Sequence, residues 1–233
     1  MLLGPVDYTL LFLGMALEAS VLVCALARSA FRRYLALNLY MAVCCANDLA
    51  GYKVLLAYGA RSPEYSHYYY YSQLLLTISL FLALINLYSL VFDEMRADRL
   101  VRFGAVLLLL GTCIVSFIAA WRSTESMVIR FIVEVSQNLY FVGVVLTYVL
   151  WGAIVKLRET RTRLVQFVLS LGIYFSALAA NYALRNLWPS LSVVWIYVPP
   201  VVGFLLPLSW MYAFLRLSEE SKLAPARLGV MAR

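Results

Sequence analysis

The stretch 126–157 sets polar and ionisable side chains into an otherwise apolar segment. Arg130, Glu134 and Asn138 are spaced by four residues, so they would share one face of a helix, with Gln137 beside them. A helix of this length can cross a bilayer, and ionisable groups inside such a helix are rare unless they have a function. These side chains are therefore the first candidates for a binding site.

Further polar side chains fall at similar depth in other apolar segments. Glu18, Asp48 and Asn181 lie between the expected midplane and the outer side of the membrane, whereas Lys53 and Arg185 lie closer to the outer surface. A lone carboxylate near the middle of a bilayer is costly. These carboxylates therefore require partners, water or a neutral form.

The sequence predicts that these groups converge on a polar cavity open to the outer side. Its floor would be Glu18 and Asp48, its walls Glu134, Asn138 and Asn181, and its rim the basic residues Lys53, Arg130 and Arg185. Such a cavity could bind a small polar molecule, or its carboxylates could hold a cation or a proton. The alternative is an internal network of hydrogen bonds and ion pairs that fixes helix packing without any ligand.

Catalytic and metal-binding motifs are absent from the sequence. It has no HExxH, no GxSxG and no Gly-rich phosphate loop, and its intramembrane carboxylates lack a flanking motif typical of hydrolysis. The four cysteines all fall inside apolar runs without CxxC spacing, and the single histidine, His67, precedes a predicted span. We expect no enzymatic activity, no metal and no cofactor.

The elements that would position these groups are transmembrane helices. The chain is 64% hydrophobic and 13% charged, with a mean hydropathy of +0.84, far from the composition of a soluble domain. Seven apolar runs are long enough to cross a bilayer: 8–28, 34–58, 68–92, 100–121, 127–155, 164–187 and 193–216. We expect an all-α bundle of seven transmembrane helices over 1–217, followed by a short polar tail at 218–233.

The distribution of basic residues predicts the orientation of this bundle. One set of loops and the C-terminal tail holds 14 of the 19 Lys and Arg residues: Arg28, Arg32, Arg33, Arg96, Arg99, Arg102, Lys156, Arg158, Arg161, Arg163, Arg216, Lys222, Arg227 and Arg233. Positive loops stay cytoplasmic, so the N-terminus would be outside and the C-terminus inside. The net charge of +7 is then a topology signal, and no nucleic-acid partner is expected.

Two segments on the outer side each have a structural and a functional interpretation. The five tyrosines between Tyr65 and Tyr71 are typical of an aromatic belt at the membrane surface, and the alternative is a ligand-binding lid. The adjacent Pro199 and Pro200 remove backbone donors and should bend or break the last helix. The bend would serve packing alone, or it would act as a hinge beside the ligand.

Seven spans with an outside N-terminus resemble the layout of G-protein-coupled receptors and of microbial rhodopsins, in topology only. The last span has no lysine for retinal and no Asn-Pro…Tyr pattern, and the end of the third span reads Val91 to Arg96 without the acidic-Arg-aromatic triplet of the receptors. In its general composition and layout the chain is similar to uncharacterised bacterial seven-helix membrane proteins. This similarity does not indicate a function.

Three function classes remain open from the sequence. We favour a non-enzymatic, receptor-like membrane module that binds a ligand or a partner, with a polar cavity open to the outer side, in a bacterial plasma (inner) membrane. The first alternative is an accessory or anchoring subunit that docks a membrane-protein partner or a second copy of itself. The second alternative is a proton- or cation-coupled transporter, although carriers usually show paired broken helices and only the last span looks broken here.

Overall fold

The computed structural model describes residues 5–92, 98–121, 127–157, 161–188, 190 and 192–217. Over this part of the chain it is all-helical, without strands. The helices are α1 (Pro5–Ala27), α2 (Leu35–Tyr58), α3 (Pro63–Phe92), α4 (Asp98–Trp121), α5 (Met127–Leu157), α6 (Thr162–Leu187), α7 (Ser192–Gly203) and α8 (Leu205–Arg216). The tail predicted at 218–233 lies outside the described residues.

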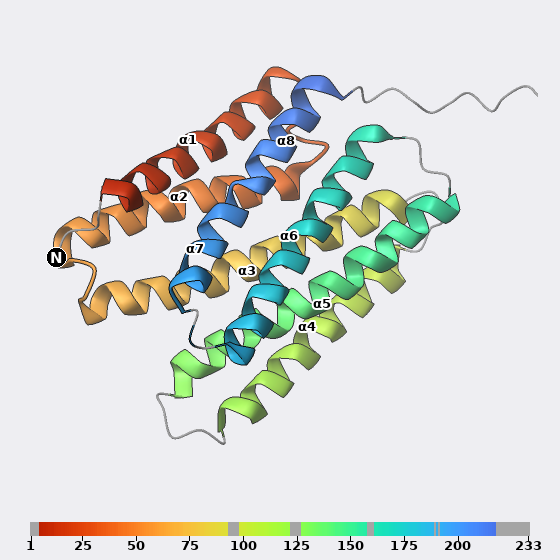
Figure 1. The fold of residues 1–233 in the computed structure, drawn as a ribbon. Coiled ribbons are helices and arrows are strands. Elements are labelled where there is room, and N and C mark those ends of the chain that lie inside the picture. The colour runs from red at the N-terminus through yellow and green to blue at the C-terminus, as the bar shows by residue number, and fades with distance from the viewer. Residues whose placement is uncertain are drawn as a thin grey trace, which may run out of the picture.

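The helices form a bundle in which the first and last elements are neighbours (Figure 1). α1 packs against α2 and α8, α2 against α3, α3 against α5, and α5 against α6, which in turn packs against α7 and α8. This closes a ring. α4 lies outside the ring and contacts α5 and, less extensively, α3. Many side chains of α4, including Leu107, Ile114 and Ile118, are exposed on its outer face.

Six helices are long and apolar enough to cross a membrane, which indicates an integral membrane protein in contact with lipid. They are α1, α2, α3, α5, α6 and the segment Tyr197–Arg216, which combines most of α7 with α8. In α4 the apolar stretch Leu107–Trp121 falls short of that length among the residues searched. A seventh crossing at α4 therefore stays a prediction.

The helix predicted over 193–216 is interrupted at Phe204, between α7 and α8. The sequence placed the disruption at Pro199 and Pro200, but both prolines lie inside α7. Pro207 has no N–H, so it cannot bond the carbonyl of Gly203 as an uninterrupted helix would require. The backbone N–H of Phe204 accordingly bonds the carbonyl of Val201, 3.3 Å away, in a tighter turn.

α3 begins five residues before the predicted span, and its start has a clear local cause. The side chain of Ser62 accepts a hydrogen bond from the backbone N–H of Tyr65 at 3.0 Å, as an N-cap residue does. Pro63 occupies the first helical position, where its missing N–H has no cost. The tyrosine-rich stretch is thus helical, which fixes the direction of each ring.

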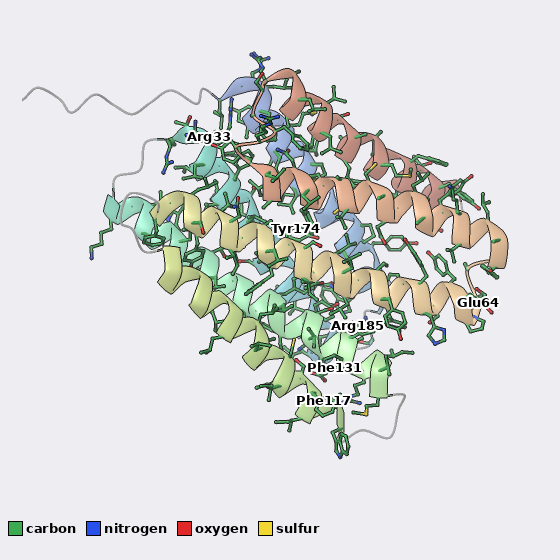
Figure 2. The ribbon with its side chains drawn as sticks, turned by 180° about the vertical axis from the view of Figure 1, so that it is seen from behind. Arg33, Glu64, Phe117, Phe131, Tyr174 and Arg185 are labelled. Carbon is green, nitrogen blue, oxygen red and sulfur yellow. The ribbon has the colours of Figure 1, made fainter. Side chains whose placement is uncertain are left out.

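Basic side chains hold the helix ends on the other side of the bundle. Arg163 is buried and donates to the backbone carbonyls of Ala213 and Leu217 at 3.2 and 2.8 Å. Arg28 donates to the carbonyl of Leu215, at the same end of α8. Figure 2 shows Arg33 and Glu64 at opposite ends of the bundle, and the arginine contacts gather at the Arg33 end.

Candidate functional site

A half-enclosed cavity of about 430 Å³ lies at the end of the bundle where α1 begins and α2 ends. It extends from Asp7 and Tyr65, near these helix ends, inward to Glu18 and Pro207. α1, α2, α3, α7 and α8 all contribute to its lining. The cavity thus depends on helices from both ends of the chain, because α8 packs directly against α1.

Glu18 and Asp48 both line this cavity, as the sequence placed them together on its floor. Their carboxyl groups are close enough to interact electrostatically. The Oε2 atom of Glu18 is buried and has no hydrogen-bond partner among the described residues. Burying a charged oxygen without a partner is unfavourable, so this carboxyl group needs a partner or a neutral form.

Two glycines let other groups approach the carboxylates and the rings closely. A Cβ atom at Gly14 would lie 3.8 Å from Oδ2 of Asp48 and 3.6 Å from the ring of Phe204. A Cβ atom at Gly51 would lie 3.1 Å from the ring of Tyr68. A larger side chain at Gly14 would therefore project between α1, α2 and the break at Phe204, into the cavity.

Aromatic side chains form much of the remaining wall: Tyr52, Tyr65, Tyr68, Tyr69, Tyr197 and Phe204. The hydroxyl of Tyr68 lies 2.6 Å from the backbone oxygen of Asn47 and 2.8 Å from its Oδ1, either of which can accept its proton. This contact ties α3 to α2 beside Asp48. Three of the tyrosines come from the stretch for which a lid was weighed against an aromatic belt.

Gln73 adds a polar contact on the α3 side of the cavity. Its Nε2 donates to the hydroxyl of Tyr140 at 2.7 Å, and the hydroxyl of Thr77 lies 3.2 Å from the same oxygen. Tyr140 is buried and stacks on Tyr182, with ring centroids 5.8 Å apart. The cavity wall is thereby joined to α5 and α6.

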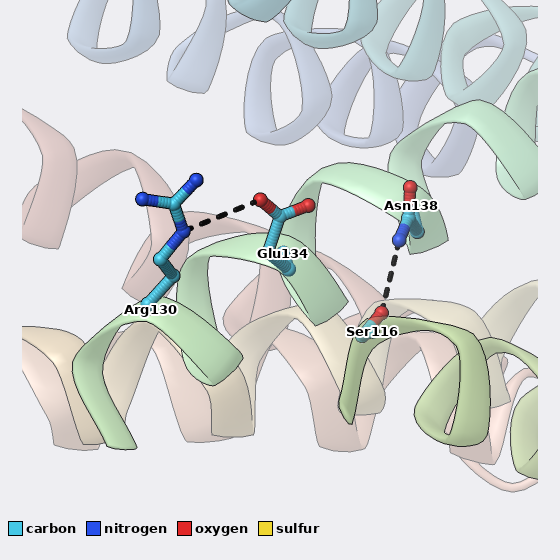
Figure 3. A network of polar contacts seen from close by, with 4 residues as sticks. All are labelled: Ser116, Arg130, Glu134 and Asn138. Atoms are coloured by element: carbon cyan, nitrogen blue, oxygen red, sulfur yellow. Dashed lines mark hydrogen bonds and ion pairs between the residues drawn. The ribbon is translucent and has the colours of Figure 1, made fainter. Parts of the chain in front are cut away.

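The polar residues predicted on α5 lie outside the cavity: Asn138 contacts α4, and Arg130 and Glu134 pair with each other on α5 (Figure 3). Nε of Arg130 is 3.9 Å from Oε1 of Glu134, and their side chains are 44% and 28% exposed. Nδ2 of Asn138 donates to the hydroxyl of Ser116 at 2.9 Å. Glu134 and Asn138 do not appear in the described lining of the cavity. Their contacts fit the packing alternative that the sequence left open.

The predicted basic rim does not appear around the cavity either. Lys53 and Arg185 are exposed, and Asn181 is buried in α6 with its Oδ1 unpartnered among the described residues. None of these three side chains is in the cavity lining. Arg185 lies close enough to Tyr69, which lines the cavity, and to Tyr182 to interact with both electrostatically.

Several residues that line the cavity were not identified from the sequence, including Asp7, Gln73 and Tyr197. Asp7 sits in the first turn of α1, where an acidic residue also favours the helix dipole, so its position alone did not mark a site. Pro207, just after the break in the last helix, also lines the cavity. No group of three His, Cys, Asp or Glu side chains that could hold a metal ion occurs among the described residues.

Comparisons with protein-family models, with curated proteins and with solved structures find no match to this chain.

Proposed function

We propose that this chain is a seven-span, receptor-like membrane protein, with its N-terminus outside, that binds a small polar molecule in the cavity between α1, α2, α3 and α7. The observation that carries this proposal is the cavity of about 430 Å³ with Glu18 and Asp48 at its inner part. It lies at the Glu64 end of the bundle, away from the arginine contacts of Arg28 and Arg163. By the positive-inside rule this end faces outward.

The composition of the cavity supports binding rather than packing alone. Ligand sites are concave, largely apolar, and carry a few placed polar groups, and this cavity has aromatic walls around two carboxylates. We propose no catalytic role for these groups, and a bacterial plasma membrane stays the predicted location.

A test of this proposal fills the cavity from its α1 wall. Gly14→Phe places a ring where a Cβ would already contact Phe204, and Gly111→Phe on α4 is the matched control because nothing lies within 4 Å of its Cβ position. A panel of small polar molecules is screened for thermal stabilisation of the purified protein. We expect at least one compound to stabilise the wild type and Gly111→Phe but not Gly14→Phe. Equal stabilisation of all three proteins, or none in the wild type, would contradict the proposal.

The break at Phe204 favours a second candidate, a cation-coupled transporter. Carriers place interrupted helices at their substrate sites, and here Gly203, Phe204 and Pro207 all line the carboxylate cavity. The test is uptake: protein reconstituted in liposomes would accumulate a compound from the same screen when a proton or sodium gradient is applied. Binding without accumulation would leave the receptor-like function and exclude this candidate.

A further inference from the structure

Acidic side chains line the cavity, and the described basic residue nearest to its tyrosines, Arg185, lies outside the lining. Asp7, Glu18 and Asp48 contribute three carboxyl groups to its lining, and the described lining residues include no Lys, Arg or His. A negatively charged ligand would be repelled by Glu18 and Asp48 in the inner part of the cavity. A neutral ligand, such as a sugar, would bring no counter-charge, so Glu18 and Asp48 would have to be protonated to lie away from bulk water.

The backbone adds to this negative potential on the opposite wall. Because Pro207 has no N–H, the carbonyl of Gly203 lacks the donor that an uninterrupted helix would provide, and both residues line the cavity. Carbonyl oxygens at the C-terminal end of a helix carry partial negative charge. α7 ends at Gly203 and α8 begins at Leu205, so the opposite ends of the two helix dipoles lie side by side and offset each other. The carbonyl of Gly203, without its helical donor, is the backbone group that favours the same sign of ligand as the carboxylates.

The walls select an organic cation over a bare metal ion. Tyr52, Tyr65, Tyr68, Tyr69, Tyr197 and Phe204 surround the space, and the negative faces of aromatic rings attract ammonium groups. A metal ion instead requires several oxygen, nitrogen or sulfur ligands in a tight shell. No cluster of three such acidic, histidine or cysteine side chains occurs among the described residues.

We propose that the ligand of this cavity is a small organic cation, an amine or quaternary ammonium group, with Glu18 and Asp48 as its counter-charges and the tyrosine rings as its walls. This inference rests on the proposed binding function and specifies its ligand class. The ammonium group could belong to a free molecule or to a lipid headgroup, since both present the same chemistry at the outer end of the bundle.

The test compares two probes of the same shape that differ in charge. Choline carries a trimethylammonium group, and 3,3-dimethyl-1-butanol is its neutral isostere. Binding is measured by calorimetry in a maltoside detergent, which contains no amine that could compete. We expect choline to bind the wild type at least about tenfold more tightly than the isostere, since one charge contact of modest strength is sufficient for that ratio. Equal affinity for the two probes would overturn the inference.

Amide variants identify the groups responsible for the preference. Glu18→Gln and Asp48→Asn each remove a cavity charge, and Glu134→Gln makes the same change in α5, outside the described cavity lining. We expect the first two to lose choline affinity by about tenfold or more with isostere binding unchanged, and the third to bind like the wild type. Unchanged choline affinity in both cavity variants would overturn the assignment. The wild-type probe comparison decides the ligand class even where a variant does not fold.

Further outcomes distinguish a failure of the cation inference from a failure of the proposed binding function. They also distinguish a lipid headgroup from a free amine as the source of the cation. If the isostere binds as well as choline and both are lost in Gly14→Phe, the cavity is a ligand site and the cation inference fails alone. If neither probe binds the wild type, the cation inference fails, and the compound panel decides separately on the cavity. Competition by dihexanoyl phosphatidylcholine at lower concentration than choline would assign the cation to a lipid headgroup; weaker competition would assign it to a free amine.

Discussion

The backbone of Gly143 in α5 lies directly against the ring of Phe175 in α6. A Cβ atom at Gly143 would come within 2.5 Å of the ring carbons Cδ1 and Cε1 of Phe175, closer than real atoms allow. Phe175 is itself fully buried, so its ring has little room to move. α5 and α6 owe their close approach to the missing side chain at this position, which is typical of helix contacts in membranes.

Gly143→Ala should therefore destabilise the protein by about 1–3 kcal/mol, the usual cost of overpacking a dense interior. Gly152→Ala is the matched control, because it is in the same helix and nothing lies within 4 Å of its Cβ position. It should leave stability unchanged or raise it slightly, since alanine is the better helix former. Unfolding of both variants in detergent measures the difference, and equal midpoints would contradict the predicted clash.

Arg163→Ala should destabilise the contact between α6 and α8. The substitution removes the donors to the carbonyls of Ala213 and Leu217 and the stacking of the guanidinium on Phe214, 5.8 Å from its centroid. We expect a loss of roughly 2 kcal/mol or more, because hydrogen bonds from a charged group contribute about 1.5–3 kcal/mol each.

The exposed Arg216, in the last turn of α8, provides the control for this arginine. Arg216→Ala should cost less than about 1 kcal/mol, the usual range of a charge at a helix end. Thermal unfolding of the two variants separates the roles. If Arg163→Ala unfolds at the same temperature as Arg216→Ala, the buried contacts do not stabilise α8.

The hydrogen bond from Asn138 to Ser116 should couple α4 to α5 weakly. Polar contacts between helices in membranes average about 0.6 kcal/mol, and this one is 2.9 Å long and partly buried. A double-mutant cycle of Asn138→Ala and Ser116→Ala should give a coupling energy of that order. The cycle of Asn138→Ala with Ser209→Ala, whose partner is Gln166, should give none. A coupling as small as in this second pair would show that α4 is held by apolar contacts alone.

The termini should lie on opposite sides of the membrane. With α4 as a crossing helix the chain spans seven times, an odd number, and the basic loops place the C-terminal side in the cytoplasm. Reporters that are active only inside or only outside the membrane, fused to each end in turn, test this. Two termini on the same side would show that α4 lies beside the bundle without crossing it.

The sequence placed Glu18 and Asp48 at a common level along the bundle, but it could not predict which way each polar residue faces around the bundle. Glu18 and Asp48 were expected at the same depth, and they do line one cavity. Glu134 was expected at that level too, yet its contact is with Arg130 on the same helix, outside the cavity lining. Hydropathy and charge report position along a helix, whereas the neighbours of each helix follow from side-chain packing.

The positions of the helix ends also differ in how far local sequence determines them. The Ser62–Pro63 pair marks the start of α3 by local chemistry and was readable from the sequence, although the predicted span began later. The break at Phe204 depends on which of the three prolines interrupts the helix, and the sequence did not show this. Pro199 and Pro200 sit within α7 without ending it, and Pro207, three residues after the break, removes the bond that would have joined α7 to α8.

The pairing of α1 with α8 has a consequence for biogenesis. α1, α2 and α3 are synthesised first, and until α8 follows, Glu18 and Asp48 lack the wall that covers their side of the bundle. A nascent chain of the first three helices therefore presents two carboxylates toward lipid or the translocon, at considerable energetic cost. We therefore expect the insertion machinery to hold these helices until α8 has been synthesised.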